Sequence, residues 1–571
     1  MRKTKVVLAK VLTAAMVISS FAGVQGITSE AAAKPKLSKK SVSITVGKTK
    51  KITVKNAKKY KVSWKMKSKK IASFKKSGKY AVKVTAKKAG KTTLTATIKK
   101  GKKIKKLVCK ITVKKNSPKV TKTPVNTPTT SPSNVPKTTE VPTVKPTATA
   151  TAEPQDTTPA MKEIFKGVID NVGTCLTYNQ TWNNRKEMQD VSTMKFVDKN
   201  FNSFTLENEM KPDSMLNKHN MISVADAKAK GYVISDDYKE STVPELTLET
   251  IDGVLAIAKQ HNIRMRAHTL MWHQQTPTWF FKKNYDDNEA VVDEATMNAR
   301  LEFFVRTIMR HTMQKEKELT GEVGSIVYAW DVLNEYIHRS NAAAATTWVS
   351  VYGDMGLKPT YVKAAFEYAY DELKRENVQD KVTLFYNDYD TYFSVDDELA
   401  LISYINEGEE AKICGGIGMQ SHVDIKRPTL EEYGNALKAF INAGLEVQIT
   451  ELDITINFDT DETDGRTPTY AYKNEKETDA DQAAFTKDFI KQIVDIQKNL
   501  QKNRDKNKSL KGITGITVWG ISDQTSWRGS CKPLFFTRKN VRVKDETTGK
   551  YKTVYTYVPK KSYEAMIEAL K

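Results

Sequence analysis

Two apolar segments of the chain each lead directly to a glutamate. Residues 328–333 lead to Asn334-Glu335, and residues 447–450 lead to Glu451. Either glutamate alone reads equally well as the first solvated residue of a loop. The two together lie 116 residues apart, at equivalent positions in two predicted strands, and so indicate a convergent pair of carboxylates.

A pair of carboxyl groups is what the hydrolysis of a glycosidic bond requires. One protonates the leaving oxygen, and the other stabilises or attacks the sugar carbon. The first must stay protonated while the second stays ionised, which burial and mutual repulsion can arrange. Because the sequence does not give the separation of the two groups, residue spacing leaves both retention and inversion open.

Aromatic and amide side chains of the kind that bind sugars accompany this pair. Flat aromatic faces suit the C–H surfaces of pyranose rings, and amides pair with hydroxyls. The residues concerned are Trp272, Trp279, Trp519, Trp527, Asn208, Gln275, Asn334 and Gln420. Ordinary core packing is the alternative for the tryptophans, and it fits Trp330 in the middle of a strand.

Other hydrolytic chemistry and cofactors are disfavoured. His268, His273 and His422 are candidates for zinc ligands, but the first two are five residues apart and lack the H-E-x-x-H spacing. Hydroxyl binding, or the orientation of a catalytic glutamate, suits these histidines better. The chain has no G-x-S-x-G motif and no G-x-G-x-x-G after a strand. We therefore expect no metal and no cofactor.

Six motifs resemble those of glycoside hydrolase family 10, and they occur in the family's order between residue 161 and about residue 540. They are Phe204–Asp213, Arg266–Pro277, Trp330–Glu335, Gly416–His422, Ile449–Asp453 and Trp519–Trp527. The family consists of endo-β-1,4-xylanases on a (β/α)8 barrel. The resemblance implies this fold, this activity and xylan or xylo-oligosaccharides as substrate.

The resemblance also implies the roles of individual residues. Glu335 matches the general acid/base and Glu451 the nucleophile of a retaining double displacement, and Asn334 matches the residue that binds the sugar 2-OH. The residues that match partners of the two glutamates are His422, Asp453 and Gln420.

Further residues match the family's substrate cleft. The glycone side is expected to contain Glu207, Asn208, Lys211, His268, Trp272 and Gln275. Trp519 and Trp527 match the aromatic walls, and Trp527 is expected to crowd the hydroxymethyl group of a hexose. Asn387 and Tyr389 match the aglycone side.

The chain departs from the family pattern at four places. Ala267 stands where the family usually has glycine, residues 234–246 read as an insertion, residues 454–481 form a long acidic loop, and residues 541–557 lengthen the C-terminal end. These departures leave the catalytic motifs intact. They put in doubt the outer subsites and the preference among decorated xylans.

Strands and helices alternate from residue 161 to the end, which predicts a parallel α/β fold. Short apolar strands are expected at 201–205, 264–268, 325–332, 382–386 and 447–450. A closed barrel is favoured, because the chemical motifs directly follow these strands and barrel enzymes carry their chemistry at the strand C-termini. We assign residues 161–571 to this catalytic domain.

Residues 34–115 alternate between β-branched residues and lysines, which predicts a small all-β sandwich. Residues 46–50, Trp64 and residues 84–91 resemble a bacterial Ig-like domain of group 2. Residues 116–160 hold 9 of the 18 prolines among threonines and are expected to form an extended linker.

The first 33 residues have the pattern of a signal peptide. Residues 1–5 contain three basic residues, an apolar run follows at 11–24, and the small residues Ala31-Ala32-Ala33 come after it. The sequence thus predicts secretion to the extracellular space. No later run of about 18 apolar residues predicts a membrane span. The four cysteines are far apart, which favours buried thiols over bridges.

The net charge of +26 is unevenly distributed. Residues 34–115 contain 31 lysines and no arginine, aspartate or glutamate, whereas residues 161–571 contain 53 basic and 62 acidic residues. Nucleic-acid binding is disfavoured because the basic region lacks arginine, the usual bidentate reader of guanine and phosphate. We expect instead that this region holds the enzyme near an anionic surface, such as a cell wall or glucuronic-acid-bearing xylan.

Two other functions compete with a xylanase. A catalytically silent polysaccharide-binding barrel would normally have lost one of the two glutamates, and both are present. A β-1,4-glucanase of broad specificity has the same machinery, and Trp527 only biases the pocket against it. A monomer is expected in each case.

Overall fold

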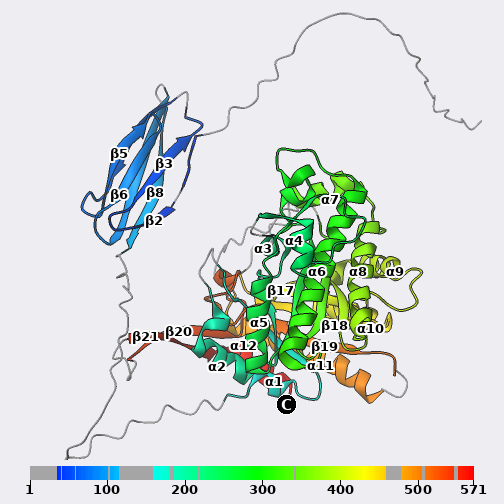
Figure 1. The fold of residues 1–571 in the computed structure, drawn as a ribbon. Helices are drawn as coiled ribbons and strands as arrows, with labels where there is room; N and C mark the ends of the chain where they lie inside the picture. Colours follow the sequence, from blue (N-terminus) through cyan, green and yellow to red (C-terminus); the bar gives the residue numbers. More distant parts are fainter. Residues whose placement is uncertain are drawn as a thin grey trace, which may run out of the picture. The chain divides into compact units, whose positions relative to one another are not determined.

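A computed structural model of the chain describes most of its length. The described residues are 35–39, 41–57, 60–100, 103–114, 158–180, 185–216, 219–339, 343–457, 477–503, 508–544 and 551–571. The chain divides into two compact units, residues 1–148 and 149–571 (Figure 1). Each unit is described by itself.

The N-terminal unit is all-β, as the sequence predicts. One sheet has the order β1 (Lys36–Leu37), β3 (Thr49–Lys55), β6 (Ala81–Ala86), β5 (Ala72–Gly78). The other has the order β2 (Ser41–Thr45), β8 (Lys103–Lys114), β7 (Gly90–Lys100), β4 (Lys61–Met66). Ile52 and Val82 of the first sheet share a buried core with Leu94 and Ile111 of the second, so the two sheets form a sandwich.

The C-terminal unit is a closed barrel of eight parallel strands. In chain order these are β9 (Asn171–Leu176), β10 (Ser203–Leu206), β13 (Arg264–Trp272), β14 (Val327–Asn334), β15 (Thr383–Asp388), β16 (Gly416–Met419), β18 (Glu446–Thr455) and β19 (Gly512–Val518). Each pairs with the next, and β19 pairs with β9 to close the ring. The predicted (β/α)8 barrel is confirmed.

Helices connect the strands and surround the barrel (Figure 1). They are α2 (Val191–Asn200), α5 (Leu248–His261), α6 (Glu294–Thr320), α8 (Thr360–Glu376), α9 (Val395–Ile405), α10 (Leu430–Asn442), α11 (Asp479–Lys502) and α12 (Lys561–Ala569). Thr429 and Glu432 form a capping box that starts α10, and Gly321, at φ 89°, ends α6. Local signals of this kind fix where the connecting helices begin and end.

The barrel strands deliver the chemical motifs to one end. Trp272, Asn334 and Asn387 occupy the same level on three adjacent strands, at their C-terminal ends. Glu335 directly follows β14, and Glu451 lies in β18. The motifs therefore lie at the end of the barrel where such folds carry their active sites.

Ala267 lies within β13, whereas the three longer departures lie almost entirely outside the strands of the barrel. The segment 234–246 contains β12 (Thr242–Pro244), which pairs with β11 (Met221–Ser223), and its Glu240 forms an ion pair with Arg300 of α6. The described residues of the segment 541–557 lie in the paired strands β20 (Phe536–Lys544) and β21 (Tyr551–Pro559). Most of the acidic loop lies outside the described residues, because 458–476 are not among them.

Three sequence predictions concern the remaining parts of the chain. The predicted signal peptide and most of the predicted linker lie outside the described residues. Across the segments that are described, no helix is both long enough and apolar enough to span a bilayer. Cys109, Cys175, Cys414 and Cys531 are free and buried, which confirms the expected unpaired thiols.

A buried ion pair inside the barrel stabilises the strands that carry the site. Arg266 is fully buried, pairs with Asp331 of the next strand and donates to Gln448 Oε1 at 2.8 Å. The same Asp331 accepts a hydrogen bond from His268 Nδ1 at 3.0 Å. These contacts tie β13 to β14 and, across the barrel, to β18.

Replacing Arg266 by methionine is expected to destabilise the enzyme by about 3–5 kcal/mol, because it leaves the Asp331 charge buried without its partner. Urea unfolding of the wild type and of Arg266→Met measures this difference. Lys166→Met, which removes an exposed ion pair with Glu163, is the control and should change stability by under about 1 kcal/mol. Equal effects of the two changes would contradict the role of the buried pair.

Candidate active site

Glu335 directly follows β14 and is held by side chains of neighbouring strands. Its backbone is in the left-handed region, with φ 58°. The Trp272 indole donates to Glu335 Oε2 at 2.8 Å, and Gln420 Nε2 donates to Oε1 at 3.0 Å. The carboxyl group is therefore fixed from two sides at the C-terminal end of the barrel.

Glu451 lies in β18 and is held in the same way. Asn387 Nδ2 donates to Glu451 Oε1 at 3.0 Å, and His422 Nε2 lies 3.1 Å from Oε2. Both oxygens of this carboxylate thus have a hydrogen-bond partner.

A chain of three amides connects the two glutamates. Gln420 Nε2 donates to Glu335 and also to Asn334 Oδ1, at 3.3 Å. Asn387 Nδ2 donates to Glu451 and also to Asn334 Oδ1, at 2.9 Å. The Asn334 oxygen accepts from both sides, so the orientations of all three amides and the relative placement of the two carboxyl groups are set together.

The two glutamates have opposite protonation states at mildly acidic pH. Burial, together with the negative charge of Asp388, raises the pKa of Glu335 to about 7. Burial alone would raise the pKa of Glu451 as well, but the hydrogen bond from His422 and nearby positive charges lower it to about 2. One site thus holds a protonated acid and a carboxylate anion.

His422 owes its charge to Asp453. Burial alone would lower the pKa of this histidine, but the charge of Asp453 and hydrogen bonds to Asp453 and Glu451 raise it to about 9. Asp453 Oδ2 lies 2.8 Å from His422 Nδ1, and the carboxylate also accepts from Trp527 and Arg528. The predicted partner roles of His422 and Asp453 match this geometry.

Most of the predicted glycone-side residues lie together beside the catalytic pair. Lys211 Nζ lies 4.7 Å from the Trp272 ring centroid and donates to Asn208 Oδ1 at 3.4 Å. Glu207 accepts from Gln180 and Arg185, at 3.0 and 2.6 Å. Two further predicted residues have charged partners: His268 bonds Asp331, and Gln275 donates to Asp213.

The predicted aromatic residues differ in exposure. Trp519 is buried, with its edge toward His268 and His422. Trp527 is 42% exposed and presents its ring next to His422, 4.9 Å between centroids. Trp279, a candidate for sugar binding, is instead buried, and its ring stacks on that of His219 with 4.2 Å between centroids. This arrangement fits the alternative of core packing.

Asn387 lies deeper than its predicted place on the aglycone side. Its side chain is fully buried and bonds Asn334, Thr450 and Glu451. A side chain without exposed surface positions the carboxylate and does not itself contact a sugar. Tyr389 is only partly buried, and its ring lies 4.3 Å from that of His338.

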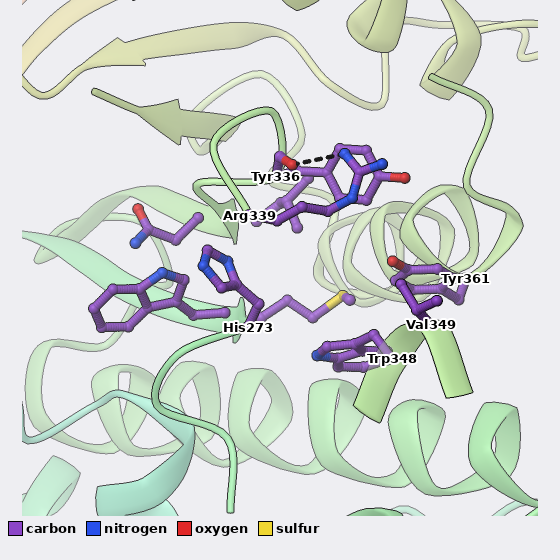
Figure 2. Close-up of a pocket in the computed structure, with 10 residues that line it drawn as sticks. His273, Tyr336, Arg339, Trp348, Val349 and Tyr361 are labelled. Carbon is purple, nitrogen blue, oxygen red and sulfur yellow. Dashed lines mark hydrogen bonds between the residues drawn. The ribbon is translucent and has the colours of Figure 1, made fainter. Parts of the chain in front are cut away.

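A pocket lined in part by Trp272 and Asn334 extends to α7 (Ala343–Tyr352). Figure 2 shows His273 and the α7 residues Trp348 and Val349 among its lining residues. Trp348 of α7 stacks on Tyr361, 4.9 Å between ring centroids. His273 faces this pocket, and neither of its ring nitrogens has a partner among the described residues. Burial and the charge of Arg339 lower the pKa of His273 to about 4, so this ring is neutral.

The three histidines considered as zinc ligands have separate partners. His268 bonds Asp331, His422 bonds Glu451 and Asp453, and His273 faces the pocket. Across the described ranges, the group with the side-chain types of a metal site is a different one, His338, Asp388 and Glu398.

Some residues of the site were not predicted from the sequence. Arg185 pairs with Glu207, Gln274 reaches Glu335 at 3.4 Å, and Arg528 pairs with Asp453. Gln274 lies within a recognised motif and Arg528 directly follows one, which is the signal that could have found them. Arg185 lies outside all the motifs, and only the fold brings it to the site.

A parallel (β/α)8 barrel with an acid and an anion at its C-terminal end defines a glycoside hydrolase. The model of glycosyl hydrolase family 10 matches residues 160–555. The chain belongs to this family.

The similar proteins are xylanases by name. The chain is 40% identical over 356 residues to endo-1,4-beta-xylanase A of Butyrivibrio fibrisolvens, a match covering 62% of this chain and 76% of that protein. It is 32% identical over 351 residues to endo-1,4-beta-xylanase B of the same organism, covering 60% and 47%.

Among solved structures, endo-1,4-beta-D-xylanase 10B of Clostridium thermocellum complexed with xylohexaose is similar, with a TM-score of 0.50 and 26% identity. That match covers 72% of this chain and 68% of the solved chain.

The pKa values of the two glutamates predict the pH dependence of kcat/KM. Activity should fall as the pH rises through about 7, because Glu335 then loses the proton that it must donate. It should fall on the acid side only as the pH approaches about 2, where Glu451 becomes protonated. Initial rates on xylan over this range, with folding checked at each pH, measure both limbs. A profile that rises through pH 7 would contradict the assignment.

Proposed function

We propose that this protein is an endo-β-1,4-xylanase that cleaves xylan internally with retention of configuration. The observation that carries the proposal is the buried pair of glutamates with opposite protonation states, in a family 10 barrel. The names of the similar proteins support xylan as the substrate.

In the first step the Glu451 carboxylate attacks the sugar carbon while Glu335 protonates the leaving oxygen. The hydrogen bonds from Asn387 and His422 aim the nucleophile, and those from Trp272 and Gln420 aim the acid. The product of this step is a glycosyl ester of Glu451.

In the second step water hydrolyses this ester, and Glu335 acts as the base. Once Glu451 is esterified, its negative charge no longer opposes ionisation of Glu335. The pKa of Glu335 then falls, so the group that gave a proton in the first step can accept one in the second. The pKa of a single residue thus changes in step with the reaction.

Replacing Glu451 by alanine should abolish catalysis, with a loss of at least about 10⁴-fold in kcat, because no nucleophile remains. The release of reducing ends from xylan by the wild type and by Glu451→Ala measures this. Equal release from both would contradict the mechanism. No release from the wild type, with retained binding, would favour the catalytically silent polysaccharide-binding barrel.

A β-1,4-glucanase of broad specificity is the second candidate. Trp527 is exposed beside the nucleophile's partners, where it is proposed to crowd a hexose hydroxymethyl group. Trp527→Ala should therefore raise the ratio of carboxymethylcellulose to xylan hydrolysis by about 3- to 10-fold. The readout is the ratio of the two rates within each protein. The substitution also removes the hydrogen bond from Trp527 to Asp453, and this loss lowers the rates on both substrates. A wild type faster on the cellulose derivative would overturn the xylan assignment.

The basic N-terminal unit is proposed to hold a secreted enzyme near an anionic surface, a cell wall or glucuronic-acid-bearing xylan. In this unit each lysine whose side chain is described is exposed. Nothing acidic in residues 34–115 neutralises them. The signal-like N-terminus supports extracellular action, and the enzyme is proposed to act as a monomer, without nucleic acid as a partner.

Deletion of residues 1–159 should abolish retention of the enzyme on washed cell walls or on glucuronoxylan at low salt. Binding of the full chain to the same surface should weaken steeply with salt, since exposed charges are screened over about 10 Å at 0.1 M. A sedimentation assay at several salt concentrations measures both effects. Unchanged retention after the deletion would contradict this role.

A further inference from the structure

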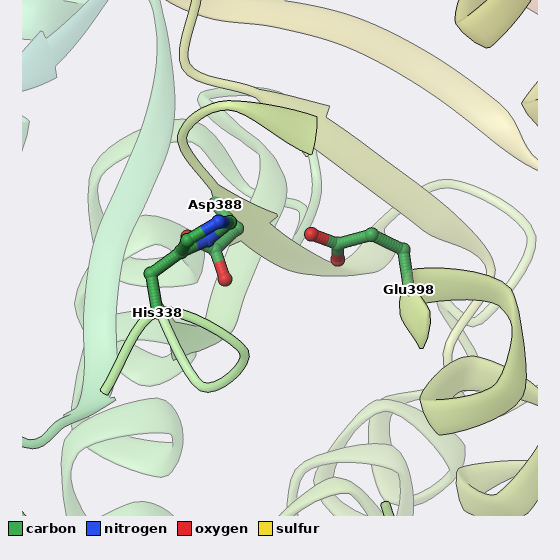
Figure 3. A group of neighbouring side chains, drawn as sticks. All are labelled: His338, Asp388 and Glu398. Carbon is green, nitrogen blue, oxygen red and sulfur yellow. The ribbon is translucent and has the colours of Figure 1, made fainter. Parts of the chain in front are cut away.

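His338, Asp388 and Glu398 form a group of neighbouring side chains (Figure 3), and the charge of Asp388 acts on the general acid. His338 follows Glu335 by three residues, Asp388 ends β15, and Glu398 lies in α9. Asp388 and Glu398 are fully buried. No step of the mechanism above uses this group.

The side-chain types would suit a metal ion, but the hydrogen bonds do not. Asp388 Oδ1 accepts from His338 Nδ1 and the Tyr389 amide, at 3.0 and 2.8 Å. Its Oδ2 accepts from the Tyr386 hydroxyl and the Ile337 amide. Four donors occupy the lone pairs of this carboxylate, so none is left for a cation.

Glu398 is a buried carboxyl group with a single hydrogen-bond donor among the described residues. Burial and the charge of Asp388 raise the pKa of Glu398 well above its usual range. Its Oε1 accepts from Ser394 at 3.1 Å, while Oε2 has no partner among the described residues. The raised pKa favours the protonated form of Glu398, which can be buried without a metal ion.

Asp388 connects the segments that hold Glu335. Through Ile337 and His338 its carboxylate binds the loop directly after the general acid. The backbone carbonyl of Asp388 accepts a hydrogen bond from the backbone N–H of Gln420 at 2.9 Å, and the Gln420 side chain donates to Glu335. Asp388 thus supports both the loop that follows Glu335 and Gln420, whose side chain orients the Glu335 carboxyl group.

His338 packs against Tyr389 and is influenced by several titratable groups. Its ring lies 4.3 Å from that of Tyr389, inclined by 34°. Burial alone would lower the pKa of His338, but the hydrogen bond and the charge of Asp388 raise it. The other titratable groups that face the pair are Glu335, Asp390, Tyr386 and Glu398.

We propose that His338 and Asp388 are positioning residues of the general acid, which fix the loop of Glu335 and the ring of Tyr389 and set the charge that Glu335 experiences. This inference rests on the proposed function. The pair has a counterpart in His422 and Asp453, which hold Glu451. In that pair His422 contacts Glu451 directly. In the pair proposed here, the charge of Asp388 acts on Glu335.

The sign of the charge effect follows from this arrangement. Replacing His338 by glutamine removes a positive charge and leaves Asp388 uncompensated, so Glu335 keeps its proton to higher pH. Replacing Asp388 by asparagine removes the negative charge, so Glu335 loses its proton at lower pH. The two substitutions act on the same limb of the pH profile in opposite directions.

The test compares kcat/KM over pH for xylohexaose and for 2,4-dinitrophenyl β-xylobioside, whose leaving group needs no proton. With xylohexaose, the alkaline limb should move up by about 0.5 pH unit in His338→Gln and down by a similar amount in Asp388→Asn. The loss of kcat/KM on xylohexaose should be about 10-fold, against less than about 2-fold on the dinitrophenyl substrate.

Two further variants keep the result decisive. His338→Lys retains the positive charge and should leave the limb near its wild-type position, which tests the charge even if Asp388→Asn does not fold. His311→Gln removes a His–Asp pair between α6 and α5, where His311 bonds Asp252 at 2.8 Å, and should change nothing.

Equal losses on both substrates, or limbs that move in the same direction, would overturn the proposal. A wild type that cleaves neither substrate would instead overturn the proposed function.

Discussion

The active site depends on one shared acceptor, the side-chain oxygen of Asn334. It receives hydrogen bonds from Gln420 and from Asn387, and each of these amides uses its other N–H on one of the two glutamates. The orientation of one carboxyl group cannot change without affecting the other. These residues lie at the C-terminal ends of consecutive strands β14, β15 and β16 and in the next strand, β18, so the pairing of the strands assembles the arrangement.

The same barrel keeps the two carboxyl groups chemically different. Both are buried, and burial alone would favour the neutral form of each. Glu451 is hydrogen-bonded to the His422 imidazolium, which Asp453 keeps charged. The charge with the largest effect on the pKa of Glu335 is instead the negative charge of Asp388. Neighbours of opposite sign thus divide one pair of identical side chains into an acid and a nucleophile.

The sequence predicts the parts of this site that lie in contiguous motifs. Strand alternation places Glu335 and Glu451 at strand ends, and the family motifs identify His422, Asp453 and Gln420 beside them. The burial of a side chain is harder to predict. Asn387 matches the aglycone side of the family's cleft, but its side chain is fully buried. The roles of Arg185 and of the His338–Asp388 pair could not be predicted, because they arise from contacts between segments that are separate in the sequence and match no motif.

The central claim is that Glu335 is a protonated acid beside an ionised Glu451, and ¹³C NMR titration of the glutamate carboxyl carbons tests it most directly. In the wild type Glu335 should titrate near pH 7. In Glu451→Gln its pKa should fall, because the neighbouring negative charge is gone. A Glu335 that titrates near pH 4.5 in both proteins would contradict the account.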